Sequence, residues 1–454
     1  MSSTFRPAGA GRSHDPHANL VFKRGSGHRV WDTTGRVYID LIGGYSSLNL
    51  GHAHPVLLAV AQEQLKQLTF CTGGNSPWMA ELEQALVDVV SRSRLPGGTE
   101  LLNSPARQAG PTMNSPARQA GPTMSTTWTS PKVWLSTTGA RAVEVAWKVA
   151  FANRPGGLMR FDLGYHGRSL ATSLISDTQR SSALTVFSQL DETQLEGNGV
   201  VPYPRCGSQC DGHCLECNAS ISAAQSWLKR NGQTTSAMIM EPAIGARGYY
   251  FASGEYYRRL VRLLREHDLL VISDEIQMGL GRLGFMVASH AQGWIPDLIV
   301  FGKSLGGGIT PISAVIGDAN RMDRLGQGIE SESFAANPLA CKIAIEVLTI
   351  LNDAILLERV RLVGNRFREL LQKSLPNECR VDGRGLCTAI DLSSFGDESA
   401  EVTRRWVCQL REHGVLVHLT GAQSDRVAII PPLNVDEETL WHVANILSRT
   451  WKDR

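Results

Sequence analysis

The chain has 454 residues, of which 42% are hydrophobic and 19% are charged, so it is long enough for a large core and two domains. Its formal net charge of +2 gives no electrostatic reason to expect nucleic acid or an anionic membrane as a partner. It contains no apolar run near the roughly 20 residues of a membrane-spanning helix. Its polar first residues lack the apolar stretch of a secretory signal, so we expect a cytoplasmic protein.

The first elements are a hairpin and two helices. Residues 29–40 contain two alternating hydrophobic and polar runs around a turn at residues 32–35, which predicts a β-hairpin. The apolar spacing of residues 54–68 and 77–92 predicts two helices.

A perfect repeat follows at residues 103–124, where the string NSPARQAGPTM is written twice. It has no apolar periodicity and contains Pro, Gly, Ser and Asn throughout, which predicts a flexible surface loop. The loop enters a predicted strand at residues 133–137 from its amino end, opposite the end where parallel sheets bind ligands. We interpret the repeat as an insertion without a functional role, from a tandem duplication or an imperfect gene model.

The segments SAMIMEP, LLVISDEI and DLIVFGKSL are three short apolar runs that place Glu241, Asp274 and Lys303 at their ends. Continuous apolar strands that alternate with helices are typical of a parallel sheet covered on both faces. In such sheets the chemistry lies beyond the carboxyl ends of the strands. We therefore expect these three charged residues at one functional edge.

After about Glu330 the pattern changes to a long helix at residues 337–351 and shorter strands, which predicts a second, smaller α+β domain. We divide the chain into three parts. Residues 1–55 form an N-terminal segment that packs with the small domain. Residues 56–329 form a large α/β domain with a mostly parallel sheet and the repeat insertion, and residues 330–454 form the small domain.

Lys303 beside a buried strand has two interpretations. One is an ion pair with Asp274 or Glu241. The other is covalent catalysis, because desolvation lowers the pKa of an amine and makes it a nucleophile toward aldehydes. The glycines at residues 306–308 permit close approach of the backbone to a bound group.

In combination, these motifs resemble the class III aminotransferases, which are pyridoxal-phosphate (PLP) enzymes of fold type I. The resemblance runs from about residue 30 to the C-terminus. The segments that carry it are VWDTTGRVYIDLIGGYSSLNLGHAHP, STTGARAVEVAWK, YHGRSL, MEPAIGARG, SDEIQMGLGRLG, DLIVFGKSLGGGITPISAVIG and SFAANPLACKIA. The motifs around Asp274 and Lys303 together are a highly specific signal of this family, whereas any one of the motifs alone is a weak signal.

The resemblance implies roles around PLP. Lys303 would form the internal aldimine and move the proton between the substrate carbon and the cofactor. Asp274 would keep the pyridine nitrogen protonated, so that the ring accepts electrons. Thr138, Gly139 and Ala140 would bind the phosphate, because they lie at a predicted helix N-terminus.

Four further residues match positions of the family. Tyr165 matches the aromatic residue that stacks on the ring, Gln277 the glutamine near the ring hydroxyl, and Glu241 the glutamate beside the substrate. Ser333 matches a position where the family usually has a threonine that contacts the phosphate of the neighbouring subunit. The resemblance therefore implies a homodimer with shared active sites.

The chain departs from the family pattern at positions that affect which substrate can bind. Arg141 stands where the family usually has glutamate, and its charge opposes the helix dipole. Ala428 replaces an arginine that grips an α-carboxylate in many members, and Arg426 lies two residues earlier as an alternative. Arg168 resembles the carboxylate-binding arginine of members that act on ornithine, acetylornithine or 4-aminobutyrate. Tyr45 falls in a substrate-facing segment of the ornithine type.

We predict an aminotransferase that moves an amino group from an amine, ω-amino acid or amino acid to a keto acid or aldehyde. A dialkylglycine-type decarboxylase or an aminomutase shares the motifs, but the decarboxylase lacks an arginine at position 168 and has glutamine at position 45. A non-catalytic relative is the third hypothesis. Arg141 and Ala428 favour it mildly, while the intact Lys303 and Asp274 argue against it.

Four of the nine cysteines lie in RCGSQCDGHCLEC, at Cys206, Cys210, Cys214 and Cys217. Structural zinc sites usually combine two short pairs across a longer loop. The spacing here is three, three and two intervening residues. This favours a cysteine-rich surface loop, with no metal, and leaves a metal site as the open alternative.

Overall fold

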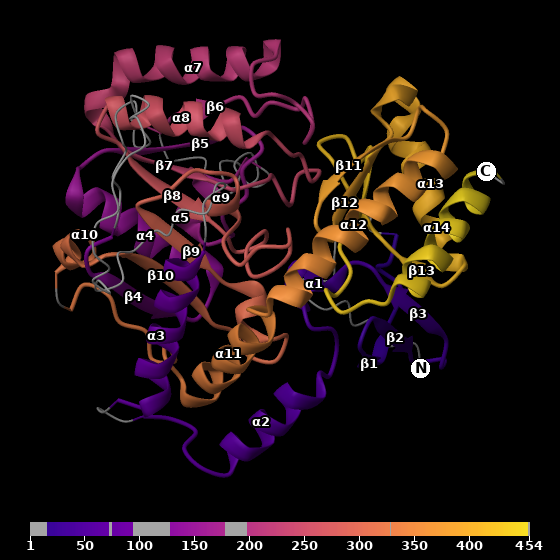
Figure 1. Ribbon diagram of the computed structural model, residues 1–454, viewed down its shortest axis with the longest axis horizontal. Coiled ribbons are helices and arrows are strands. Elements are labelled where there is room, and N and C mark those ends of the chain that lie inside the picture. Colours follow the sequence, from indigo (N-terminus) through magenta and orange to yellow (C-terminus); the bar gives the residue numbers. More distant parts are fainter. Residues whose placement is uncertain (1–15, 72–74, 94–127, 178–197, 327, 453–454) are drawn as a thin grey trace, which may run out of the picture.

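The computed structural model describes residues 16–71, 75–93, 128–177, 198–326 and 328–452. A large α/β part and a smaller part lie side by side (Figure 1); the long helix α11 (Pro338–Leu351) packs against the large part, and the following helix α12 (Ala354–Ser374) packs within the smaller part. The repeat at residues 103–124 falls outside the described residues, so its interpretation stays a prediction.

The large part is built on a seven-stranded sheet. In sheet order the strands are β4 (Pro131–Ser136), β10 (Ser313–Asp318), β9 (Leu298–Phe301), β8 (Leu270–Asp274), β7 (Thr235–Met240), β5 (Gly157–Phe161) and β6 (Val200–Val201). Strands β9, β8, β7, β5 and β6 run parallel, while β10 is antiparallel to both β4 and β9. The prediction of a mostly parallel sheet in an α/β fold is confirmed.

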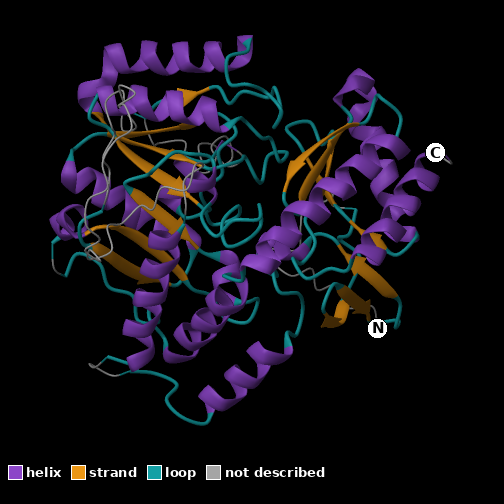
Figure 2. Cartoon of the chain, viewed as in Figure 1, coloured by secondary structure: helices purple, strands orange, loops and turns teal. Residues whose placement is uncertain are grey.

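Helices cover both faces of this sheet (Figure 2). The helices of the large part are α3 (Pro77–Arg92), α4 (Gly139–Asn153), α5 (Leu170–Leu174), α7 (Leu215–Asn231), α8 (Gly254–Glu266), α9 (Ala288–Ala291) and α10 (Ala319–Met322), with 3₁₀ turns η2 (Gly232–Thr234), η3 (Lys303–Gly306) and η4 (Asp323–Leu325). Helix α2 (Pro55–Leu65) packs against α11 instead of the sheet. Side chains along a strand alternate between faces. Ala237 and Ile239 of β7 pack with α4, whereas Met238 and Met240 pack with α7 and α8. Burial on both faces explains the continuous apolar runs in the sequence.

Two smaller sheets join the ends of the chain. One contains β1 (Phe22–Ser26), β2 (Arg29–Asp32), β3 (Val37–Asp40) and β13 (Val415–Leu416); the other contains β11 (Arg380–Arg384), β12 (Cys387–Asp391), β15 (Arg426–Ile429) and β14 (His418–Thr420). Three helices complete this part: α1 (Gly43–Ser46), α13 (Ser399–Glu412) and α14 (Glu437–Lys452), with the 3₁₀ turn η5 (Ser393–Glu398). Strand β3 pairs in parallel with β13, so the N-terminal segment shares a sheet with the C-terminal part.

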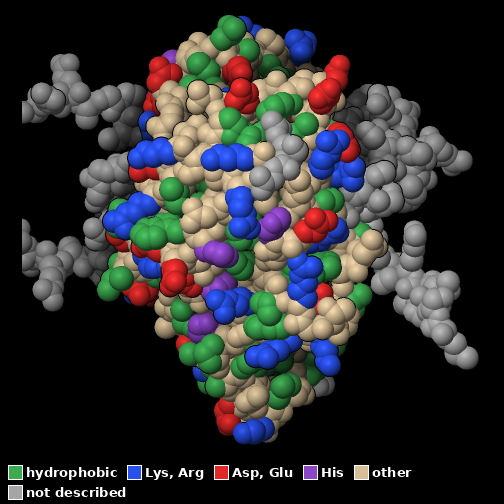
Figure 3. Space-filling model, turned by 90° about the vertical axis from the view of Figure 1, so that its right-hand side faces the viewer, with side chains coloured by type: hydrophobic (Ala, Val, Ile, Leu, Met, Phe, Trp, Pro, Cys, Tyr) green, Lys and Arg blue, Asp and Glu red, His purple; other side chains and the backbone are tan. Residues whose placement is uncertain are grey.

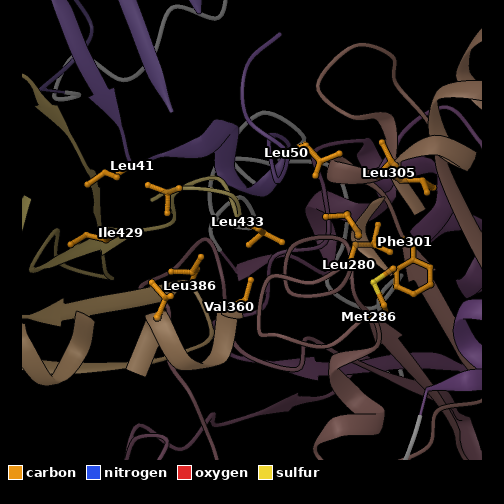
Figure 4. Packing of buried hydrophobic residues seen from close by; sticks show 14 of the residues in the cluster. Leu41, Leu50, Leu280, Met286, Phe301, Leu305, Val360, Leu386, Ile429 and Leu433 are labelled. Atoms are coloured by element: carbon orange, nitrogen blue, oxygen red, sulfur yellow. The ribbon is translucent and has the colours of Figure 1, made fainter. Parts of the chain in front are cut away.

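A single hydrophobic cluster extends across the three parts of the chain. It includes Leu41 from the N-terminal segment, Leu280 and Phe301 from the large part, and Leu386 and Ile429 from the small part (Figure 4). A shared core restricts how far the parts can separate without exposing apolar surface.

A buried arginine ties the same three parts together. The guanidinium of Arg282 donates to the carbonyls of Leu386 (2.9 Å) and Pro431 (2.5 Å) and to Oδ1 of Asn49 (2.5 Å). Burial lowers the pKa of Arg282 to about 10. Each donated hydrogen bond offsets part of the cost of placing a cation in the interior.

The surface mixes charge types. Figure 3 shows Lys and Arg, Asp and Glu, and hydrophobic side chains interspersed over the face on the side of the small part. Among the described residues, no helix combines the length and apolar character needed to cross a membrane.

Candidate active site

The candidate site lies beyond three neighbouring parallel strands. The register places Met240 beside Ser273 and Asp274 beside Val300, so β7, β8 and β9 end at the same edge of the sheet. Glu241 follows β7, Asp274 ends β8, and Lys303 opens η3 just after β9. The topology therefore brings the three predicted charged residues to one edge.

Asp274 is buried and held on both carboxylate oxygens. Its Oδ2 lies 2.8 Å from Nδ1 of His166, and its Oδ1 accepts a hydrogen bond from the backbone N–H of Ile276 (3.1 Å). The histidine fixes the orientation of the carboxylate and supports its negative charge. Sequence reasoning missed His166, although it sits beside Tyr165 in the YHGR motif.

Glu241 is buried among backbone donors. It accepts hydrogen bonds from the N–H of Tyr165 (2.9 Å) and of Gly245 (3.0 Å). Burial raises the pKa of Glu241 to about 7, and the negative charge of Asp274 adds to the rise. The carboxyl group therefore positions Tyr165 and can exchange a proton near neutral pH.

Lys303 combines a left-handed backbone conformation with a lowered pKa. Its φ of 44° is in the left-handed region, which residues with a Cβ adopt infrequently. Burial lowers the pKa of the Lys303 amine to about 8, although Asp274 and Glu241 oppose the shift. A substantial neutral fraction is then available as a nucleophile and as a base.

The N-terminus of α4 faces this edge. Thr138 caps the helix, and its Oγ1 accepts from the backbone N–H of Arg141 (3.3 Å). Helix geometry leaves the other first-turn N–H groups without intrahelical acceptors, which suits an anion such as phosphate. At Gly139 a Cβ would lie 2.8 Å from Cδ1 of Ile276, so a larger residue there would require the end of that side chain to move.

The YHGR segment packs against the same helix end. Gly167 has a φ of 134°, and a Cβ there would lie 2.6 Å from Cβ of Ala140. This close contact brings the YHGR turn against the first turn of α4. Arg168 is exposed and forms no hydrogen bond or ion pair with any residue that the structure describes.

Gln277 and Tyr45 approach from other elements. Nε2 of Gln277 donates to the hydroxyl of Tyr249 (2.7 Å), and a Cβ on Gly245 would overlap Oε1 of Gln277. Tyr45 in α1 has a φ of 56° and is 44% exposed. Its ring contacts the ring of His418 edge-on at a centroid distance of 4.9 Å.

Arg141, which the sequence left without explanation, lies in a charged network. Its guanidinium pairs with Glu144 (3.2 Å), with Glu332 (3.4 Å) and with Glu330. The side chain of Glu330 is fully buried and also pairs with Lys148 (2.5 Å). These carboxylates offset the unfavourable position of a cation in the first turn of a helix.

Ser333 lies on the segment that this network holds. The neighbouring Glu332 accepts from the N–H (3.0 Å) and hydroxyl (2.7 Å) of Thr137, at the end of β4. Ser333 itself is exposed. Its predicted contact with a phosphate across a subunit interface stays a prediction.

Arg426 is buried in the small part. Its guanidinium pairs with Asp391 (2.5 Å) and lies over the ring of Tyr250, 4.1 Å from the centroid. The prediction that Arg426 contacts the substrate stays a prediction, and this pairing argues for a structural role.

Together, the groups at this edge fit PLP. The helix N-terminus suits its phosphate, the amine of Lys303 suits its aldehyde, and the buried carboxylate of Asp274 suits its pyridine nitrogen.

Comparisons with known proteins agree with this site. The chain matches the family described as "Aminotransferase class-III" over residues 10–96 and 107–451. It is 31% identical to the 5-aminovalerate aminotransferase of Pseudomonas aeruginosa, covering 96% of this chain and 93% of that one. It is 28% identical to the 4-aminobutyrate aminotransferase of Escherichia coli, covering 98% and 96%.

A solved aminotransferase structure is also similar to this chain. The ornithine aminotransferase of Toxoplasma gondii, whose crystals contain PLP at partial occupancy, superimposes with a TM-score of 0.76 at 27% identity. The match covers 95% of this chain and 90% of that chain. The chain belongs to the class III aminotransferase family, with the fold type I architecture. It is a PLP-dependent aminotransferase.

Proposed function

We propose that this enzyme transfers the terminal amino group of a short ω-amino carboxylate to a keto acid. The similar proteins are named for 5-aminovalerate, 4-aminobutyrate and ornithine. Each of these compounds carries an amine at the end of a short chain, remote from a carboxylate. The convergence of Lys303, Asp274 and Glu241 beyond β7, β8 and β9 is the observation that carries the proposal.

PLP supplies an aldehyde that condenses with amines and a ring that accepts an electron pair from the substrate carbon. With PLP bound, the amine of Lys303 would hold the cofactor and, when free, would take and return the proton at the substrate carbon. Its lowered pKa suits this work near neutral pH. Asp274, held by His166, would stabilise a positive charge on the ring nitrogen. Tyr165, whose backbone N–H donates to Glu241, would pack against the cofactor ring and exclude water.

Arg168 is our proposed anchor for the substrate carboxylate. A guanidinium binds both oxygens of a carboxylate in a planar, bidentate arrangement. Arg168 is exposed, has no partner among the described residues and follows Tyr165 by three positions. Tyr45, which is partly exposed on α1, is the proposed wall for the aliphatic chain of the substrate.

We propose a homodimer with Ser333 at the subunit interface. Phe334 is 64% exposed and contacts the ring of Phe70, which is 41% exposed, at 5.4 Å. Leu65 and Leu68 add further exposed apolar surface on the neighbouring helix end. Contiguous exposed apolar side chains are typical of interaction surfaces. We place the enzyme in the cytoplasm, where reducing conditions keep thiols free; none of the nine cysteines forms a disulfide.

A half-reaction screen tests the proposed substrate class. The PLP-loaded enzyme is mixed with single amines, and the decay of the cofactor absorbance is followed. We expect 4-aminobutyrate, 5-aminovalerate and ornithine to react, and pentylamine to react much more slowly than 5-aminovalerate. Equal rates for pentylamine and 5-aminovalerate would contradict recognition of the carboxylate. Stoichiometric carbon dioxide from 2-aminoisobutyrate would favour decarboxylation over transamination.

A further inference from the structure

Four cysteine sulfurs converge outside the active site, in the cysteine loop, which we define as residues 206–217 and which ends in the first turn of α7. The Sγ atoms of Cys206, Cys210, Cys214 and Cys217 all lie within 4.8 Å of one another. Cys217 Sγ lies 3.6 Å from that of Cys206 and 3.9 Å from that of Cys210. Four sulfurs around a tetrahedral zinc ion, with Zn–S bonds of about 2.3 Å, are separated by about 3.8 Å.

We propose that this loop binds one Zn²⁺ ion through the four thiolates, as a structural site. Four soft sulfur ligands in a tetrahedral cluster select zinc and leave no open position for a substrate. A disulfide is the other way to join cysteines, but all four are free thiols in the structure.

The backbone explains how an unusual spacing forms the cluster. Cys214 is the N-cap of α7, and Cys217 lies three residues later on the same side of the first turn. Gly207 and Gly212 have φ values of 94° and 86°, in the left-handed region, and turn the preceding loop back on itself. Three, three and two intervening residues therefore place four sulfurs together without a long intervening loop.

Backbone N–H groups donate to two of the four sulfurs, although Sγ of Cys210 also lies 3.8 Å from Oδ1 of Asp211. The N–H of Gly212 donates to Sγ of Cys210 (3.3 Å), and the N–H of Cys217 points to Sγ of Cys214 (3.5 Å). The N-terminal end of α7 adds a favourable dipole for thiolates. Arg259 donates to the carbonyl of Gly212 (2.5 Å), which brings a full positive charge to the loop.

The cysteine loop also connects the large part to the small part. Ser208, between the first two cysteines, donates through its hydroxyl to Asp382 of β11 (2.5 Å). Arg380 donates to the carbonyl of Cys206 (2.7 Å), and Arg384 to the carbonyl of Ser208 (3.3 Å). A zinc ion that fixes the cysteine loop would therefore stabilise the contact between the large part and the small part.

Elemental analysis of the full-length, PLP-loaded enzyme tests the site directly. Protein purified without added chelator should contain one zinc per chain. Denatured under non-reducing conditions with a chelator, it should release the zinc and expose nine reactive thiols. If the purified enzyme contains no zinc and shows only five reactive thiols, the four cysteines form two disulfides and the proposal is overturned. Iron in place of zinc would overturn the assignment of the metal.

Variants separate the cluster from the other cysteines. Cys210→Ser and Cys217→Ser should lower the zinc content at least tenfold, whereas Cys408→Ser, in α13, should keep one zinc per chain. A zinc content unchanged in both cluster variants would contradict the proposal. If these variants fail to fold, the wild-type enzyme provides the test: stripping zinc with a chelator should lower the Tm by several degrees, and added zinc should restore it. A Tm unaffected by complete zinc removal would overturn the structural role.

The cofactor absorbance distinguishes this site from the catalytic one. Loss of zinc should leave bound PLP detectable, because the cysteines are not proposed to touch the cofactor. An enzyme that holds zinc but transfers no amino group would contradict the proposed function and leave the metal site intact. An active enzyme that holds no metal would support the proposed function and contradict the metal site.

Discussion

Two regions of the molecule bury charged side chains, and they do so in different ways. In the small part, Arg426 on β15 stands opposite Asp391 on β12 in the strand register, and the two side chains pair at 2.5 Å. At the edge of the large sheet, burial raises the pKa of Glu241 to about 7 and lowers that of Lys303 to about 8. The first region pairs its charges, whereas the second holds groups that gain and lose protons near neutral pH.

The difference shows which buried charges do chemistry. A pair fixed by strand register stabilises the fold only as long as both partners are present, and it has little freedom to bind a ligand. A group with a pKa moved toward neutrality can take and return protons during a reaction. We therefore assign chemistry to the sheet edge and structure to the Arg426–Asp391 pair.

The strongest test of this comparison is Lys303→Ala. Without the amine, the enzyme loses both its covalent bond to PLP and its proton carrier, and we expect kcat/KM to fall by about 10⁴-fold or more. Borohydride reduction should fix PLP to Lys303 in the wild type and to no lysine in the variant. Lys229→Ala, an exposed change on α7, is the control and should keep full activity. Substantial activity in Lys303→Ala would contradict the assigned role.

Asp391→Asn tests the other side of the comparison. It leaves Arg426 buried without a charged partner, so we expect a loss of about 3–5 kcal/mol in the free energy of unfolding. KM values for the folded enzyme should stay close to those of the wild type. Arg426→Gln should lose stability in the same way. An increase in KM for carboxylated substrates in Arg426→Gln, with stability unchanged, would instead make Arg426 a substrate ligand.

The pKa of Glu241 predicts a pH effect on stability. The pKa rises from its usual 4.5 to about 7 in the folded protein. The folded state therefore binds more protons than the unfolded state between these values, and its stability falls as pH rises through that range. The expected loss is about 3 kcal/mol.

Unfolding of the cofactor-free protein in denaturant at pH 5 and pH 8 measures this effect. Glu241→Gln has no carboxyl group to ionise, so its stability relative to the wild type should increase from pH 5 to pH 8. A constant difference between the two proteins across this range would show that Glu241 is ionised in the folded state at both pH values.

Local patterns predicted much of the fold and part of the candidate site. The helix at residues 77–92 matches α3, because its apolar spacing and its proline near the start act within one segment. Arg141 could not be explained in this way, because its partners Glu330 and Glu332 follow about 190 residues later. The convergence of the four cysteines could not be read from their spacing, because it depends on the turns at Gly207 and Gly212 and on the N-terminal turn of α7.

The smallest predicted effect concerns Arg168, the proposed substrate anchor. Lysine keeps the charge but cannot bind both carboxylate oxygens in a planar arrangement. We expect Arg168→Lys to weaken keto-acid acceptors by about 2 kcal/mol, measured as kcat/KM. Aldehyde acceptors without a carboxylate should react at nearly the wild-type rate, and the cofactor absorbance should not change, since Arg168 is not proposed to touch the ring or phosphate. Equal losses for both acceptor classes would show that Arg168 positions the YHGR turn instead of binding the carboxylate.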